Sequence, residues 1–339
     1  MNFQKIIFYL TLILGTLISI SSYSWMGMWL GLEINLLSII PLMSNIKNPM
    51  ATEAAMKYFI TQAMASTIFL FSITLISMNS FFFMNDFILT SIFYSSLFIK
   101  MGAAPFHFWF PEIMEGLTWS TSFIMLTWQK IAPLTLVTYS NFNNLNYLIL
   151  IIIFCTIISG IMGINQTNMR KILAYSSINH LSWMLASMLF FETIWIYYFI
   201  IYTIINFNII IILKKFNIFH INQMFSSLNN NPLMKFFFML NFMSLGGLPP
   251  FLGFLPKWLT IQMMIKMNLI SLSLIIIVIT LITLYFYMRI IMSGVTMNKN
   301  SKTLNTEKLP YIKKFNLIYL INFIILMSLL FTTILFNLN

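Results

Sequence analysis

The chain has 339 residues, of which 60% are hydrophobic and only 7% are charged, and its mean hydropathy is +0.90. Soluble domains carry about 25% charged residues, so this composition excludes a protein with a fully water-exposed surface. Long, continuous apolar runs also exclude a membrane β-barrel, whose strands alternate apolar and polar residues over about ten positions. We therefore expect an all-α, polytopic membrane protein.

The hydropathy along the chain predicts about eleven transmembrane helices, each of about 20 apolar residues. The fourth and ninth expected spans are too long, and too interrupted by glycine and proline, to be single straight helices. The expected spans in chain order are 6–22, 25–43, 54–76, 81–110, 117–139, 147–163, 172–189, 193–213, 234–265, 269–291 and 317–336.

The formal net charge of +11 comes from 18 basic and 7 acidic residues, and the placement of the basic residues argues against nucleic-acid binding. They gather in the connections after the second, sixth, eighth and tenth spans. This parity is the positive-inside pattern, so we expect these connections and the amino terminus on the same side of the membrane. The residues are Lys47; Arg170 and Lys171; Lys214, Lys215 and Lys235; and Lys299, Lys302, Lys308, Lys313 and Lys314.

Cofactor chemistry is restricted by the single cysteine, Cys155. An iron–sulfur cluster needs four thiolates, and a structural zinc site needs several cysteine or histidine ligands close together. The sequence also lacks the glycine-rich loops that hold nucleotide phosphates. We therefore expect that this chain binds no redox cofactor, metal or nucleotide.

Two helix interruptions, at 102–111 and 246–256, stand beside Lys100 and Lys257. Non-helical backbone at membrane depth is tolerated only where it is buried in protein or lines a cavity. The interruptions lie five spans apart, which predicts two inverted five-helix repeats containing two discontinuous helices. Because Lys257 follows Pro256, we expect it to face the positive, amino-terminal end of the second half-helix. The alternative for either lysine is a side chain that snorkels to the membrane surface.

Four ionisable residues lie inside apolar spans: Glu33, Lys100, Lys130 and Lys257. Each costs about 2.5 to 3.5 kcal/mol at a helix centre on insertion scales, so such residues commonly mark an ion or proton path. The alternative is that they only hold neighbouring helices together. His180 and His107 are weaker candidates for a proton relay, because a buried or backbone-bonded structural histidine fits their positions equally well.

Five motifs, taken together, carry a specific resemblance. They are Gly-Leu-Glu-Ile-Asn at 31–35, Thr-Glu-Ala-Ala-Met-Lys-Tyr-Phe at 52–59, Lys-Met-Gly-Ala-Ala-Pro-Phe-His at 100–107, Trp-Gln-Lys-Ile-Ala-Pro at 128–133 and Gly-Gly-Leu-Pro-Pro-Phe-Leu-Gly-Phe-Leu-Pro-Lys at 246–257. In this order they resemble the mitochondrial NADH dehydrogenase (ubiquinone) subunit 2 family of antiporter-like membrane subunits of respiratory complex I. The resemblance covers roughly residues 25 to 290, which gives a division into an N-terminal helix (1–24), an antiporter-like region (25–290), and a basic loop with a C-terminal helix (291–339).

The resemblance implies a proton-translocating core subunit of NADH:ubiquinone reductase in the mitochondrial inner membrane, with its amino terminus and basic loops on the matrix side. It pairs Glu33 with Lys100, makes Lys130 the central residue of the proton path and makes Lys257 the distal one. NADH, FMN, iron–sulfur clusters and ubiquinone would be used by other subunits. The implied partners are other membrane-arm and accessory subunits and lipids, and not nucleic acid.

Both lines of reasoning give one mechanistic hypothesis. Charging or discharging the Glu33/Lys100 pair changes the proton affinity of Lys130, and Lys130 exchanges its proton with Lys257. Two alternatives stay open. One is a stand-alone cation/proton antiporter subunit, and the other is a structural membrane spacer whose buried charges only hold helices together.

Overall fold

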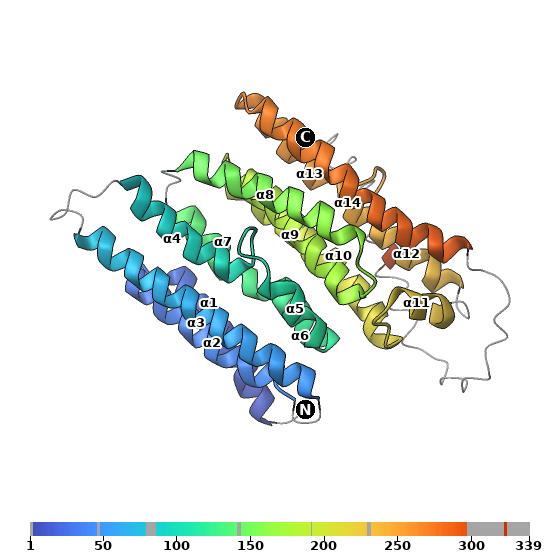
Figure 1. Cartoon of the computed structure of the whole chain (residues 1–339), viewed down its shortest axis with the longest axis horizontal. Helices are drawn as coiled ribbons and strands as arrows, with labels where there is room; N and C mark the ends of the chain where they lie inside the picture. Colours follow the sequence, from blue (N-terminus) through green and yellow to red (C-terminus); the bar gives the residue numbers. More distant parts are fainter. Residues whose placement is uncertain are drawn as a thin grey trace. The chain divides into compact units, whose positions relative to one another are not determined.

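The structure is a computed structural model that describes residues 3–45, 48–78, 86–140, 144–190, 192–228, 232–296 and 322–323. Within these ranges the chain is built of α-helices (Figure 1), and the β-type contact is an isolated bridge between Asn168 and His220. The all-α prediction is confirmed. The chain divides into two compact units, Met1–Cys155 and Thr156–Asn339.

The first unit holds seven helices in its described part. α2 packs on α1 and α3; α3 packs on α4 and α5; and α7 packs on α1, α4 and α6. The helices are α1 (Phe3–Ser21), α2 (Trp25–Met43), α3 (Pro49–Met78), α4 (Asp86–Met101), α5 (Trp109–Gly116), α6 (Trp119–Leu126) and α7 (Trp128–Tyr139).

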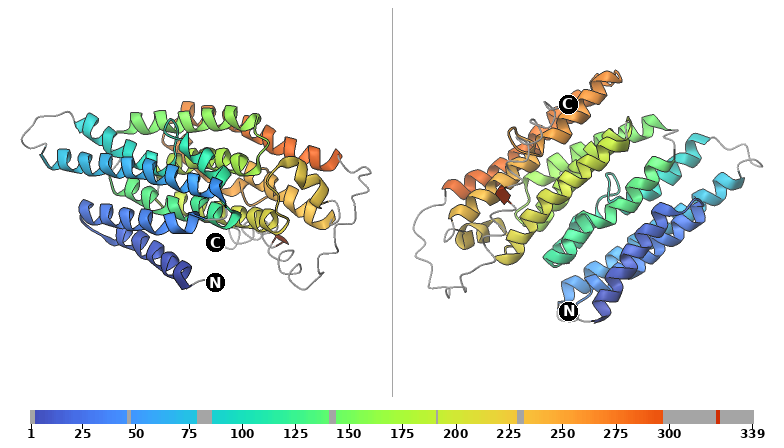
Figure 2. Two further views of the ribbon diagram at one scale, coloured as in Figure 1. Left: turned by 60° about the horizontal axis from the view of Figure 1, so that its bottom comes forward. Right: turned by 180° about the vertical axis from the view of Figure 1, so that it is seen from behind.

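Glycines bring α1 and α2 into close contact, and the two helices lie side by side in both views of Figure 2. A Cβ atom on Gly31 would lie 2.5 Å from the backbone nitrogen of Ser19, and one on Gly15 would lie 2.8 Å from that of Asn35. Small residues allow this approach of two backbones in a membrane. The contact fixes the rotation of α2, which carries Glu33 and Asn35.

The second unit surrounds a buried polar helix, α9, which packs on α10, α13 and α14. Every residue from Ile172 to Met188 is buried, and serines in this stretch donate to backbone carbonyls one turn earlier, as in the 2.8 Å bond from Ser176 Oγ to Leu173 O. The helices are α8 (Leu145–Ile164), which carries the boundary between the units, α9 (Met169–Met188), α10 (Glu192–Lys215), α11 (Ile221–Leu228), α12 (Pro232–Gly246), α13 (Phe254–Lys266) and α14 (Ile270–Thr296).

In the described part of the chain, six helices are long and apolar enough to cross a membrane: α1, α2, α3, α8, α10 and α14. The chain is therefore a multi-pass membrane protein. The buried polar helix α9 is not among the six because serine, asparagine and histidine lower its hydropathy. The expected final span, 317–336, lies outside the described residues except for 322–323, as does the basic loop before it.

The two predicted interruptions are present, at 102–108 between α4 and α5 and at 247–253 between α12 and α13. The prediction of only two discontinuous helices was incomplete, because the fifth expected span also breaks, at Thr127 between α6 and α7. Thr127 has φ −118° and ψ −74°, and its hydroxyl donates to the carbonyl of Phe123 at 2.8 Å. Such back-bonding bends helices, and Pro133, six residues later, removes a further amide donor.

Candidate functional site

Both predicted interruptions begin with the same backbone cap. Gly102 and Gly247 have φ of +71° and +75°, a conformation that residues with a Cβ atom rarely adopt. Each glycine and the residue after it donate to carbonyls three and five positions earlier, which is the Schellman ending of a helix. The bonds are Gly102 N to Ile99 O (3.2 Å), Ala103 N to Phe98 O (3.0 Å), Gly247 N to Ser244 O (3.0 Å) and Leu248 N to Met243 O (3.3 Å).

Lys100 lies in the last turn of α4, directly before the first interruption, and is only 7% exposed. Glu33 on α2 is half-buried, and its carboxylate attracts the Lys100 ammonium electrostatically. In the described part of the chain, the ion pairs within 4 Å are those of Lys57, so Glu33 and Lys100 interact over a longer distance. The structure thus brings the predicted pair together without direct contact.

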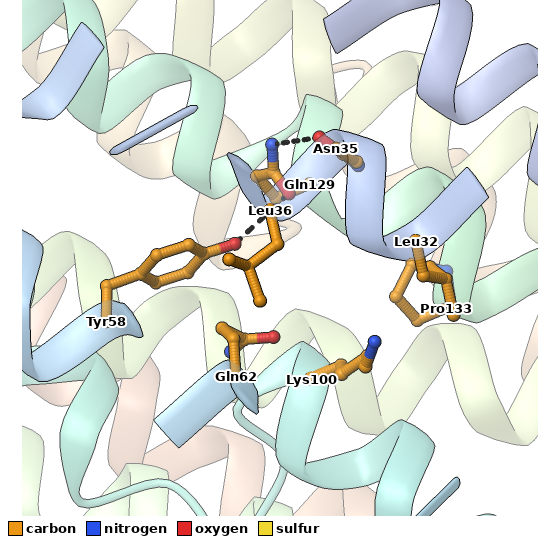
Figure 3. A pocket seen from close by; sticks show the side chains of 8 residues that line it. All are labelled: Leu32, Asn35, Leu36, Tyr58, Gln62, Lys100, Gln129 and Pro133. Carbon is orange, nitrogen blue, oxygen red and sulfur yellow. Dashed lines mark hydrogen bonds between the residues drawn. The ribbon is translucent and has the colours of Figure 1, made fainter. Parts of the chain in front are cut away.

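A small polar cavity adjoins Lys100 (Figure 3). It has room for about one water molecule. On its wall Tyr58 Oη donates to Gln129 Oε1 at 3.3 Å, and Gln129 Nε2 donates to Asn35 Oδ1 at 2.8 Å. The lining residues are Leu32, Asn35, Leu36, Tyr58, Gln62, Lys100, Gln129 and Pro133.

Lys130 is the third residue of α7, directly after the break at Thr127, and is 1% exposed. Its Nζ lies 5.2 Å from the ring centre of Phe110, at the start of α5, which is within cation–π range. Cys155 is close enough to interact with it electrostatically, and Cys155 Sγ accepts a 3.1 Å bond from the Ala104 amide inside the first interruption. The central lysine is therefore enclosed by groups in and beside the interruption, and its side chain does not reach the protein surface.

Lys257 occupies the second unit and is 7% exposed. Its Nζ donates to the carbonyl oxygens of Gly246 at 2.9 Å and Leu245 at 3.4 Å. The ammonium thus reaches back across the interruption to the carboxyl end of α12. The expectation that it faces the positive end of a half-helix was wrong, because the long side chain meets the negative end of the preceding one.

The two histidines differ in their surroundings. His107 lies in the first interruption with Nδ1 3.3 Å from Pro105 O, which is the backbone-bonded arrangement. His180 on α9 has Nδ1 2.9 Å from Tyr198 Oη, and the Tyr202 ring centre is 5.0 Å from its own. His180 therefore has a tyrosine hydroxyl in hydrogen-bond contact.

Lys57 lies outside this buried set. Its Nζ is 3.0 Å from Glu53 Oε1 and 3.0 Å from Glu112 Oε2, and the side chain is 44% exposed. Glu53 and Lys57 form an i,i+4 pair on α3, and Glu112 on α5 is an additional partner.

We expect Lys57→Met to leave the amount of assembled protein in the membrane unchanged, because exposed ion pairs add little to stability and are screened by salt. Blue-native electrophoresis at low and high salt measures this. A loss of assembled protein at both salt concentrations would show that Lys57 holds α3 to α5.

The chain matches the transmembrane family described as NADH:quinone oxidoreductase/Mrp antiporter over residues 22–283. It belongs to this family. It is 49% identical to NADH-ubiquinone oxidoreductase chain 2 of Anopheles gambiae over 303 residues, covering 87% of each chain. It is 48% identical to the Aedes aegypti chain of the same name over 333 residues, covering 97% of each. The resemblance found from the five motifs is confirmed.

The fold of this antiporter family extends to distant relatives. A chain of respiratory complex I from Thermus thermophilus superposes with a TM-score of 0.81 at 20% identity, covering 97% of this chain and 78% of that one. At this identity the similarity establishes the fold alone. Sequence reasoning missed four polar residues that line the cavity, although each is a polar side chain in an apolar span: Asn35, Tyr58, Gln62 and Gln129.

Proposed function

We propose that this chain translocates protons across the mitochondrial inner membrane as a membrane-arm subunit of NADH:ubiquinone oxidoreductase. Electron transfer from NADH through FMN and iron–sulfur clusters to ubiquinone takes place in other subunits. The observation that carries the proposal is that three of the buried lysines in the described residues, Lys100, Lys130 and Lys257, each stand at a helix interruption. The relatives' printed name supports the assignment to this complex.

In the proposed mechanism, the Glu33/Lys100 pair changes its charge state and thereby the proton affinity of Lys130. A proton then leaves Lys130 for the distal lysine, Lys257, with His180 and Tyr198 as a further relay. Moving one charge against 100 mV costs about 2.3 kcal/mol, so the change at the pair must supply energy of this size. His107 has a lesser part, because its ring bonds to the backbone of the interruption.

An internal repeat supports the proposed inverted architecture. Five pairs of helices begin 142 to 146 residues apart in the chain: α1 and α8, α2 and α9, α3 and α10, α4 and α12, and α5 and α13. The two capping glycines, Gly102 and Gly247, are 145 residues apart. A repeat of five spans turns the second copy over in the membrane, which is the arrangement of many transporters.

The proposed division into 1–24, 25–290 and 291–339 assigns proton translocation to the middle region, and the family match over 22–283 supports it. The proposed orientation places the amino terminus and the basic loops on the matrix side. The deciding experiment is the number of protons moved per NADH oxidised in an assembled complex carrying Lys130→Met. A stand-alone antiporter would instead exchange sodium or potassium for protons without NADH.

We expect Lys257→Met to lower the number of protons moved per NADH oxidised. Methionine keeps the length of the side chain but has no proton to carry and no donor for the carbonyls of Leu245 and Gly246. The measurement is proton uptake and NADH oxidation in vesicles containing the assembled complex. Lys266→Met, at an exposed position on the same helix, is the matched control. An unchanged ratio in Lys257→Met would remove this residue from the path.

A further inference from the structure

The cavity beside Lys100 combines small size with a polar wall. Its lining includes a lysine, a tyrosine and three carboxamides, and it has room for about one water molecule. The Gln62 Nε2 atom is buried and has no hydrogen-bond partner. Leaving a buried donor without a hydrogen bond costs free energy, which a bound water would offset. Polar, water-sized cavities of this kind hold ordered water.

The hydrogen bonds on the cavity wall share one direction. Tyr58 Oη donates to Gln129, and Gln129 Nε2 donates to Asn35. Tyr58 Oη therefore still has lone pairs with which to accept a bond from the cavity side. Figure 3 shows that Lys100 and Gln62 border the cavity opposite this chain, so a water there has the Lys100 ammonium as a donor on one side and Tyr58 Oη as an acceptor on the other.

Gln129 links this cavity to the central lysine. It is the residue before Lys130 and belongs to the first turn of α7, after the break at Thr127. Both ends of its carboxamide are held by bonds to α2 and α3. Any change in the bonds of Gln129 therefore acts on the turn that carries Lys130.

We propose that the cavity binds one water molecule, which joins Lys100 to the Tyr58–Gln129–Asn35 chain of hydrogen bonds. In this proposal Gln129 is a positioning residue, through which the protonation state of Lys100 affects Lys130. This inference rests on the proposed function. A protonated Lys100 donates to the water, which donates to Tyr58, so every donor in the chain points from Lys100 toward Asn35. A neutral Lys100 accepts from the water instead, and this alignment is lost. Aligned bonds in a low-dielectric interior polarise one another, so the alignment alters the field at α7.

A cryo-electron microscopy map of the assembled complex that resolves ordered water tests the site directly. We expect one water density within hydrogen-bond distance of Lys100 Nζ and Tyr58 Oη in the native complex, and its loss in Tyr58→Phe. An empty cavity in the native map would overturn the proposal.

The role of Gln129 is tested by the number of protons moved per NADH oxidised across the pH range. We expect Gln129→Leu and Tyr58→Phe each to remove this chain's share of pumped protons and to change the pH profile of the ratio, which a packing defect would not do. Gln262→Leu, an exposed glutamine on α13, is the control. A native ratio and pH profile in Gln129→Leu would overturn its role, and if that variant fails to assemble, Tyr58→Phe decides. A native ratio in Lys130→Met refutes the proposed function instead, and the map still reports on the water.

Discussion

A complex assembled with Lys130→Met oxidises NADH but moves fewer protons per NADH than the native complex. This is the largest functional effect that we expect from one side chain, because Lys130 is 1% exposed and stands at the break between α6 and α7. Methionine has no group that binds and releases a proton, so protons can no longer pass through the central position of the proposed path.

Assembly should survive this substitution. A charged side chain at a helix centre costs about 2.5 to 3.5 kcal/mol on insertion scales, and methionine removes that cost. Replacing a buried charge by an apolar residue of similar volume is often neutral or stabilising. The contact with the Phe110 ring is retained as an apolar contact, because methionine packs well against aromatic rings.

The measurement pairs NADH oxidation with proton uptake in sealed vesicles, and blue-native electrophoresis reports the assembled fraction. Lys5→Met, at an exposed lysine of α1, is the matched control and should behave as the native complex. An unchanged ratio in Lys130→Met would refute the proposed role. Loss of assembly, with the remaining complexes fully coupled, would favour the structural spacer.

The helix interruptions could be predicted because their causes are local. Glycine at positive φ and proline without an amide donor act within a few residues, so Gly102 and Gly247 are visible in the sequence. The break at Thr127 was missed because its side-chain bond to Phe123 is a conformational choice that the residue type does not dictate.

The cavity could not be predicted because its parts come from distant segments. Asn35 and Gln129 are 94 positions apart and Tyr58 and Gln129 are 71 apart, and their bonds depend on the rotation of three helices. Lys257 shows the same limit, because the sequence places it on the second half-helix while its long side chain reaches the carbonyls of the first.

Gly253→Ala should reduce the amount of assembled protein sharply, since the second interruption has no space for a methyl group at this position. A Cβ atom there would overlap the carbonyl oxygen of Ser244. That oxygen accepts the amide of Gly247, so moving it breaks the cap that ends α12. Overpacking costs typically about 1 to 3 kcal/mol and more where a rigid group must move, so we expect about 3 kcal/mol or more here.

Gly246→Ala is the matched control for this effect. It adds the same methyl group at the end of α12, where the nearest side-chain atom would be 3.7 Å away, on Tyr287. Thermal inactivation and blue-native electrophoresis of both variants measure the difference. Equal stability of the two variants would show that the backbone around Gly253 can move to accommodate a methyl group. The close contact of Lys257 with the end of α12 would then need another cause. A loss confined to Gly253→Ala would show that the close backbone packing at the second interruption is needed for a stable protein.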